Sequence, residues 1–353
     1  MRLISTLAVT TALVGVAALA ATTLPLTGSY SPTQNYLLAP LASLANLANM
    51  TAATATAAAP AGPLDRVFSA RRVHIDKVVA QLELVVSPPG QMHVQAWGKP
   101  DTMKQLQVRV VGDELYVRLD KHEEEAWFPW NIFNMWSQER SPTDLRLRIT
   151  APTATPYHIE DMTGSIMAGD LDAPLSLEAH SVTARFGRLQ SANVSVAGSG
   201  KVIIGPIKEQ LDIEIAGSGH VEAASASAAH VEIAGGGEVV LGAIAQGLDI
   251  EIAGAGDVKA ASINGPLDTQ IAGSGDVAIG GGTATSFSVE IAGSGEIVFR
   301  GHAVNPKVHI MGSGSVTLGS YSGELEKDIA GSGDVIVRSQ APVVPPPPAP
   351  PAH

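Results

Sequence analysis

The stretch Glu214–Val221 reads EIAGSGHV, and close variants of it recur down the second half of the chain. Its alternation of apolar and polar residues is typical of a β-strand with one buried face. The Gly217-Ser218-Gly219 segment contains two residues that can adopt positive φ at low steric cost, which favours a sharp corner. The sequence therefore predicts a strand that ends at a glycine corner, after which Val221 points inward again.

The phrase repeats with a nearly constant period of about 19 residues. When the copies are aligned on their alanine, the equivalent positions are Ala197, Ala216, Ala234, Ala253, Ala272, Ala292, Met311 and Ala330. A fixed period of this length indicates a solenoid, and it is too short for two helices per repeat. One coil of a parallel β-helix fits, because strands stacked about 4.8 Å apart place identical side chains in columns.

The repeat also predicts which residues mark the corners and where the solenoid begins. Less regular coils are expected at residues 158–169 and 176–187, where the spacing persists but the paired glycines do not. The predicted corner glycines are Gly198, Gly200, Gly217, Gly219, Gly235, Gly237, Gly254, Gly256, Gly273, Gly275, Gly293, Gly295, Gly312, Gly314, Gly331 and Gly333.

Composition limits the classes of function. The chain has 353 residues, 45% of them hydrophobic and only 4% aromatic, which suits a core of small aliphatic side chains. Its formal net charge is −12 and no stretch concentrates Lys and Arg, which argues against a nucleic-acid partner. The absence of cysteine excludes disulfides, Cys-ligated zinc and iron–sulfur clusters, and we expect no cofactor.

The chain divides into five predicted segments. The apolar run after Met1-Arg2 ends in a small-x-small pattern at Ala18-Leu19-Ala20, which indicates a secretion signal; an uncleaved membrane anchor reaching about residue 26 is the alternative. The predicted segments are the signal at 1–20, an Ala/Thr/Pro-rich linker with an optional short helix at 21–63, alternating strands at 64–155, the repeat solenoid at 156–338 and a Pro-rich tail at 339–353.

The strands that lead into LRLRITAPTATPYHIEDMTGSI and the serial turns AGSGKV, AGSGDV and MGSGSV resemble the bacterial auto-transporter adhesin family named for its head GIN domain. The resemblance covers roughly residues 67–338. It implies a right-handed parallel β-helix whose first part is formed by the strands of residues 64–150, and it implies no catalytic residues. The chain departs from the family in its aromatic insertion, its linker and its oligoproline tail.

Two outward-facing columns of mostly acidic residues follow from the repeat. Solvated acidic faces are the expectation, and calcium binding at Glu238, Asp257, Asp276 and Glu296 is the weaker alternative, because these turns do not match the calcium-binding repeat G-G-x-G-x-D. The first column holds Glu214, Glu232, Glu251, Gln270, Glu290, His309 and Asp328. The second holds Lys201, His220, Glu238, Asp257, Asp276, Glu296, Ser315 and Asp334.

An insertion at residues 121–142 is the densest apolar cluster outside the signal. It is interpreted as a cap or flap packed on the solenoid, or as an exposed loop that contacts a membrane, glycan or protein. The candidate binding residues are Trp127, Phe128, Trp130, Phe133 and Trp136.

The histidines are scattered, and a surface position is the expectation for each. Zinc becomes a candidate only where neighbouring coils bring two histidines together with an acid, and no metal site is predicted otherwise. No nucleophile elbow, HExxH motif or phosphate-binding loop is present, so no catalytic residues are predicted.

The sequence thus predicts a non-enzymatic, exported β-helix protein that presents a repetitive surface for binding or adhesion at the bacterial envelope. Its location would be the periplasm, the cell surface or the extracellular space, and its partner a protein, a glycan or a membrane surface. An envelope-structural or self-associating protein is the alternative, and a polysaccharide-active β-helix enzyme is a more distant one.

Overall fold

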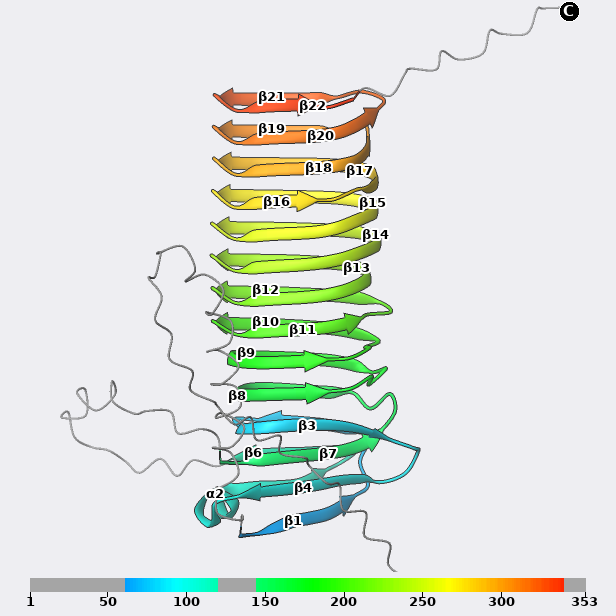
Figure 1. Ribbon diagram of the computed structural model, residues 1–353, viewed down its shortest axis with the longest axis vertical. Helices are drawn as coiled ribbons and strands as arrows, with labels where there is room; N and C mark the ends of the chain where they lie inside the picture. The colour runs from blue at the N-terminus through cyan, green and yellow to red at the C-terminus, as the bar shows by residue number, and fades with distance from the viewer. Residues whose placement is uncertain (1–60, 120–143, 340–353) are drawn as a thin grey trace, which may run out of the picture. The chain divides into compact units, whose positions relative to one another are not determined.

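The computed structural model describes residues 61–119 and 144–339, all within one compact unit, Pro60–His353. The signal, most of the linker, the aromatic insertion and the Pro-rich tail lie outside the described residues, so those predictions stay as they are. The described residues are nearly all β, and the predicted solenoid of about 19-residue coils is confirmed. Figure 1 shows the coils stacked one above another.

Parallel pairing links each coil of the solenoid to the next. The glycine corner stays in register through five successive coils, because Gly198 pairs with Gly217, Gly217 with Gly235, Gly235 with Gly254 and Gly254 with Gly273. The solenoid strands are β8 (Tyr157–Ala168), β9 (Pro174–Phe186), β10 (Ser191–Gly198), β11 (Lys201–Pro206), β12 (Gln210–Gly217), β13 (His220–Gly235), β14 (Glu238–Gly254), β15 (Asp257–Gly273), β16 (Asp276–Ile279), β17 (Gly282–Gly293), β18 (Glu296–Val304), β19 (Lys307–Gly312), β20 (Ser315–Ser322), β21 (Glu326–Gly331) and β22 (Asp334–Val337).

The two less regular coils expected before the repeat are also present. They correspond to β8 and β9, which pair in parallel with each other, and β9 pairs in parallel with β10 and β11. The solenoid core consists of inward columns such as Ile215, Ile233 and Ile252, each at most 2% exposed. Aliphatic side chains stacked in register fill most of the interior, and a few aromatic rings such as Phe287 and Phe299 pack among them.

The two glycines of each corner serve different purposes. In every regular corner the first glycine has positive φ and the second does not, as Gly254 at +134° and Gly256 illustrate. A Cβ on Gly254 would also lie 2.4 Å from the carbonyl oxygen of Gly235 in the preceding coil. A Cβ on Gly256 would lie 2.6 Å from Cγ2 of Ile233. The first glycine is therefore required by backbone conformation and close approach, and the second by the packing of the core.

The N-terminal end differs from the all-parallel arrangement that the family resemblance implies. β3 (Val79–Ser87) pairs in parallel with β8 on one side and with β7 (Arg146–Pro152) on the other. β2 (Arg72–Asp76) lies in the same way between β8 and β6 (Glu114–Leu119). The coil next to β8 is thus formed by β2 and β3, which come early in the chain. β6 and β7, which come later in the chain, are stacked on the other side of that coil.

Antiparallel strands complete this end. β4 (Met92–Gly98) pairs antiparallel with both β1 (Ala61–Phe68) and β7, and β5 (Leu106–Val111) pairs antiparallel with β6. The β5–β6 hairpin follows from its two-residue Gly112-Asp113 connection, in which Gly112 has a φ of +65°. A short helix, α2 (Pro100–Gln105), joins β4 to β5. No helix among the described residues is long and apolar enough to cross a membrane.

Candidate functional site: an acidic groove along the coils

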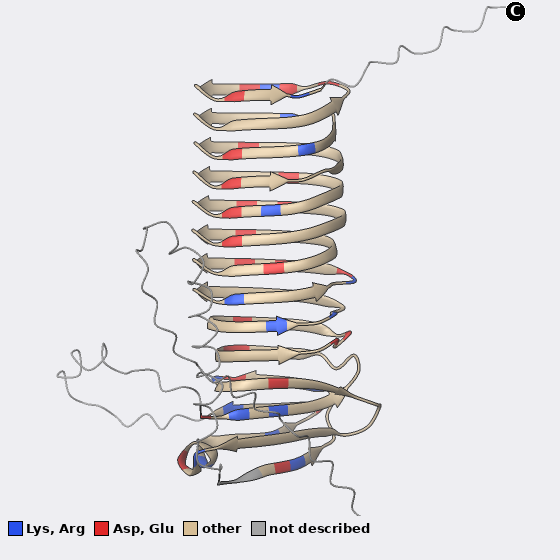
Figure 2. Cartoon of the chain, in the orientation of Figure 1, with Lys and Arg blue, Asp and Glu red and all other residues tan. Residues whose placement is uncertain are grey.

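A row of mostly acidic side chains runs along one face of the solenoid. Most members lie between two inward isoleucine or valine positions of the same strand, as Glu214 and Glu251 do, so the strand alternation fixes their outward direction. The pairing register connects Glu214, Glu232, Glu251, Gln270, Glu290, His309 and Asp328, one per coil. The first predicted column is therefore continuous, and Figure 2 shows acidic positions recurring from coil to coil.

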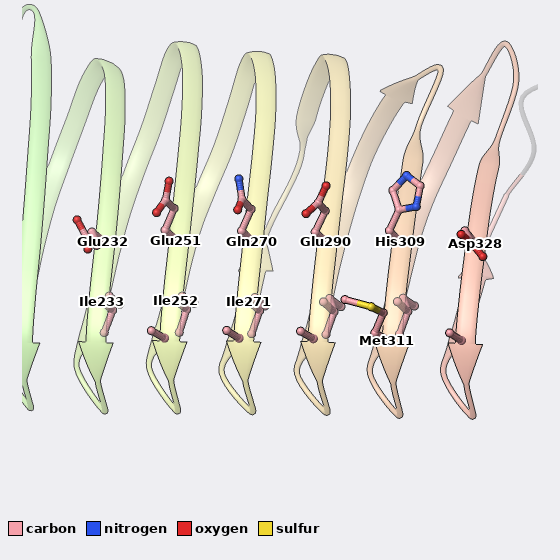
Figure 3. Close-up of a pocket in the computed structure, with 16 residues that line it drawn as sticks. Glu232, Ile233, Glu251, Ile252, Gln270, Ile271, Glu290, His309, Met311 and Asp328 are labelled. Carbon is pink, nitrogen blue, oxygen red and sulfur yellow. The ribbon is translucent and has the colours of Figure 1, made fainter.

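A second row beside the acidic one is made almost entirely of alanine. These residues also point outward, and they are two positions nearer the glycine corner on each strand. Because alanine is small, the surface is hollowed along this row, and the resulting groove has a volume of about 540 Å³. Its walls and floor run from Glu232 in one coil to Ala330 several coils later (Figure 3). We call this feature the acidic groove.

Met311 interrupts the alanine row. Its side chain is 66% exposed and pairs in register with Ala292 and Ala330. Figure 3 shows it extending along the solenoid toward the preceding coil. A flexible, polarisable thioether at this position adds apolar contact surface to a groove that is otherwise floored by methyl groups.

Like charges in the acidic row are separated by the coil spacing. Glu214, Glu232 and Glu251 are direct neighbours, whereas Gln270 and His309 interrupt the row in later coils. Carboxylates about 5 Å apart repel by roughly 1 kcal/mol or less in water, so the row is tolerated because it is exposed. A positively charged partner laid along the groove would relieve this repulsion.

A further row, on the other side of the acidic one, contains Asp212, His230, Asp249 and Asp268. His230 Nδ1 lies 3.2 Å from Asp249 Oδ2. Partial burial raises the pKa of Asp268, and the neighbouring charge of Asp249 raises it further. Negative charge on this face is therefore denser than the acidic row alone provides.

The second predicted column is continuous on the opposite side of the glycine corner. The register joins Lys201, His220, Glu238, Asp257, Asp276, Glu296, Ser315 and Asp334. Glu238 of this column lies close to two basic side chains: Lys259 Nζ, from outside the column, is 2.7 Å from Glu238 Oε1, and His220 Nδ1 is 3.1 Å from Glu238 Oε2. The hydrogen bond from Lys259 is the main reason that the pKa of Glu238 is lowered. The carboxylate of Glu238 thus already has a cationic partner in Lys259, whereas calcium at this column stays a prediction.

Sequence reasoning identified the acidic row but not the groove. The signal for the groove in the sequence is the outward alanine beside nearly every glycine corner, a recognisable pattern of small residues. The exposed Met311 in that row was a second available signal. The aromatic candidates Trp127, Phe128, Trp130, Phe133 and Trp136 lie outside the described residues, so their relation to the groove stays untested.

Comparison with solved structures gives relatives of low sequence identity. The chain is similar to a "putative adhesin" from Parabacteroides distasonis ATCC 8503, with 14% identity, 78% of this chain and 97% of that chain covered, and a TM-score of 0.36. It is similar to a "putative adhesin" from Bacteroides fragilis NCTC 9343, with 17% identity, coverage of 79% and 97%, and a TM-score of 0.35. It is also similar to a "putative lipid binding protein" from Parabacteroides distasonis ATCC 8503, with 15% identity, coverage of 80% and 98%, and a TM-score of 0.33.

Comparison with curated proteins gives no match. One family model, described as "Putative auto-transporter adhesin, head GIN domain", matches residues 77–282 and 248–343. The two matches overlap, and together they span more than half of the chain, including every coil that contributes to the acidic groove. The resemblance found in the GSG turns is therefore confirmed, and the chain belongs to the head GIN domain family that this model describes.

Proposed function

We propose that this protein is a non-enzymatic binding protein, exported to the bacterial envelope, that holds an elongated, positively charged partner along its acidic groove. The observation that carries the proposal is the continuity of the groove over successive coils, with one carboxylate or polar side chain and one alanine, or in one coil Met311, per coil. A regular ladder of this kind is suited to a partner that repeats along its own length, such as a cationic polymer or an extended basic peptide.

The chemistry of the groove favours binding over catalysis. Its acidic side chains recur once per coil and do not converge on one point, whereas a glycosidase needs two carboxylates on either side of one bond. The family to which the chain belongs is described as "Putative auto-transporter adhesin, head GIN domain", which supports a binding role and a position at the envelope or cell surface. The partner would supply cations for the acidic row and apolar stems for the alanine row.

The test compares two triple variants with the same change in net charge. E232Q/E251Q/E290Q removes three of the four carboxylates that line the groove, and D257N/D276N/E296Q removes three carboxylates from the opposite column. Retention of the full chain on immobilised poly-lysine and on chitosan, with neutral dextran as the reference, should fall for the groove variant because the charges facing the ligand are lost. The opposite-face variant should bind nearly as the wild type does.

Equal losses in the two variants would mean that net charge alone governs retention, which would contradict the groove as the binding site. Absence of binding to both cationic polymers would contradict the proposed class of partner. Export is tested separately, by fractionating cells and sequencing the N-terminus of the mature protein. A chain that starts near residue 21 in the envelope fraction is the expected result.

A further inference from the structure

Two histidines from distant parts of the sequence lie side by side at the N-terminal end of the solenoid. The register pairs His74 of β2 with Tyr116 of β6 on one side and with His158 of β8 on the other. Asp76 pairs in the same way with Glu160. The rings of His74 and His158 are 4.8 Å apart, at an interplanar angle of 76°. The fold thereby brings together two imidazoles and a carboxylate that the sequence separates widely.

The nitrogen and oxygen atoms of this cluster point at one another. His158 Nε2 contacts Glu160 Oε1, and His74 Nε2 lies 3.7 Å from Glu160 Oε2. One donor atom from each of the three residues lies within 4.8 Å of the others, and among the described residues no other group of three or more potential ligands does so. In a tetrahedral zinc site the donor atoms are about 3.4 Å apart, so the wider separations in the cluster must shorten by up to about 1.4 Å and the His158–Glu160 contact must open. Rotation of these partly exposed side chains would be enough for both changes.

The other nitrogen of His74 faces a second carboxylate. His74 Nδ1 lies 3.7 Å from Glu114 Oε1, and the ring of Tyr116 stacks on that of His74 with centroids 4.6 Å apart. Tyr116 also hydrogen-bonds Glu114, which raises the pKa of the tyrosine. A metal-binding histidine commonly donates its second N–H to a carboxylate, which fixes the tautomer and the ring orientation. Glu114 is the carboxylate placed to do this for His74, while Tyr116 stacks on the His74 ring.

The cluster differs from the other histidine contacts on the solenoid. His220 lies between Glu222 and Glu238, and His230 lies beside Asp249, but each of these has carboxylate partners without a second imidazole. The side chains of His74 and Glu114 are 16% and 22% exposed, and those of His158 and Glu160 are each 36% exposed. The site is thus mostly buried on the side of His74 and Glu114, and more open to solvent on the side of His158 and Glu160.

We propose that His74, His158 and Glu160 bind one Zn²⁺ ion, with Glu114 holding His74 in the required orientation. Three protein ligands leave a fourth coordination position, which faces solvent and takes a water molecule or a donor group of a partner. The ion connects β2 and β8, so it joins the rearranged N-terminal coils to the first of the less regular solenoid coils. The pairing register runs from His158 through Ser176 and Asn193 to Asp212, which belongs to the row beside the acidic one. The site therefore lies on the same face as the acidic groove.

Zinc titration of the tag-free full chain, after treatment with a chelator, tests the proposal by isothermal calorimetry at pH 7. We expect one ion per chain, and Co²⁺ in place of Zn²⁺ should give the strong visible absorption of tetrahedral coordination. H158N and E160Q each remove a ligand and should weaken binding at least 100-fold. E114Q should weaken it about 10- to 100-fold, as is usual for a group behind a ligand. Binding should weaken below about pH 6.5, where imidazoles are protonated.

H220N is the matched control, because it removes a histidine that has two carboxylate neighbours and no second imidazole. Its zinc affinity should remain within about twofold of the wild-type value. The proposal is overturned if the wild type binds no zinc up to millimolar concentration, if H158N and E160Q bind as the wild type does while circular dichroism shows both folded, or if H220N loses as much affinity as they do. A weak cobalt spectrum of octahedral type would also contradict it.

Discussion

At the scale of single residues, one core position departs from its column. Thr269 is fully buried and stacks between Ile250 and Val289, and its hydroxyl has no hydrogen-bond partner among the described residues. An unpaired buried hydroxyl costs about 1 to 3 kcal/mol relative to a paired or apolar group. We expect T269V to raise the free energy of unfolding by about 1 kcal/mol, measured by urea denaturation.

The reciprocal substitution V289T is the control for Thr269. It introduces the same hydroxyl one coil away, into an equally buried position, and should destabilise the protein by a similar amount. A T269V variant that is less stable than the wild type would show that the hydroxyl of Thr269 makes a stabilising contact.

At the scale of the repeated element, the glycine corner is the part of the coil that tolerates substitution least. Gly254 has a φ of +134° and lies against the preceding coil, whereas the side chain of Ala255, between the two glycines, is exposed. G254V should therefore lower the free energy of unfolding by about 1 kcal/mol or more, and A255S should leave it unchanged, because serine already occupies this place in neighbouring corners. Thermal or urea denaturation distinguishes the two, and equal effects would contradict the corner geometry.

Much of the element could be predicted from sequence because each coil meets copies of itself. The strand alternation and the period were sufficient to place Glu232 next to Glu251, and Gly235 next to Gly254, in successive coils, and the structure confirms both pairings. The insertion of β2 beside β8 could not be predicted in this way, since His74 and His158 share no repeat unit and their pairing depends on tertiary contacts. The groove could not be predicted for another reason: it is the space left on the surface beside the small alanine side chains.

At the scale of the whole described unit, the two ends of the solenoid differ. Antiparallel pairing of β1 with β4 and of β5 with β6 ends the parallel stack at one end. At the other end, β21 and β22 pair within the described residues only with β19 and β20. A strand edge of this kind is a ready site for pairing with another chain. The envelope-structural alternative, in which copies associate, depends on what adjoins that edge.

The central claim is that successive coils stack in register along one axis, and the lack of native cysteine makes it directly measurable. Spin labels on cysteines introduced at Glu214 and Glu290, and in a second variant at Glu214 and Asp328, would sit four and six coil steps apart. At about 4.8 Å per step, pulsed electron paramagnetic resonance should find the second separation longer than the first by about 10 Å, near 29 Å and 19 Å between Cα atoms. Separations that are equal, or that shorten in the second pair, would contradict the stacked solenoid and the groove built on it.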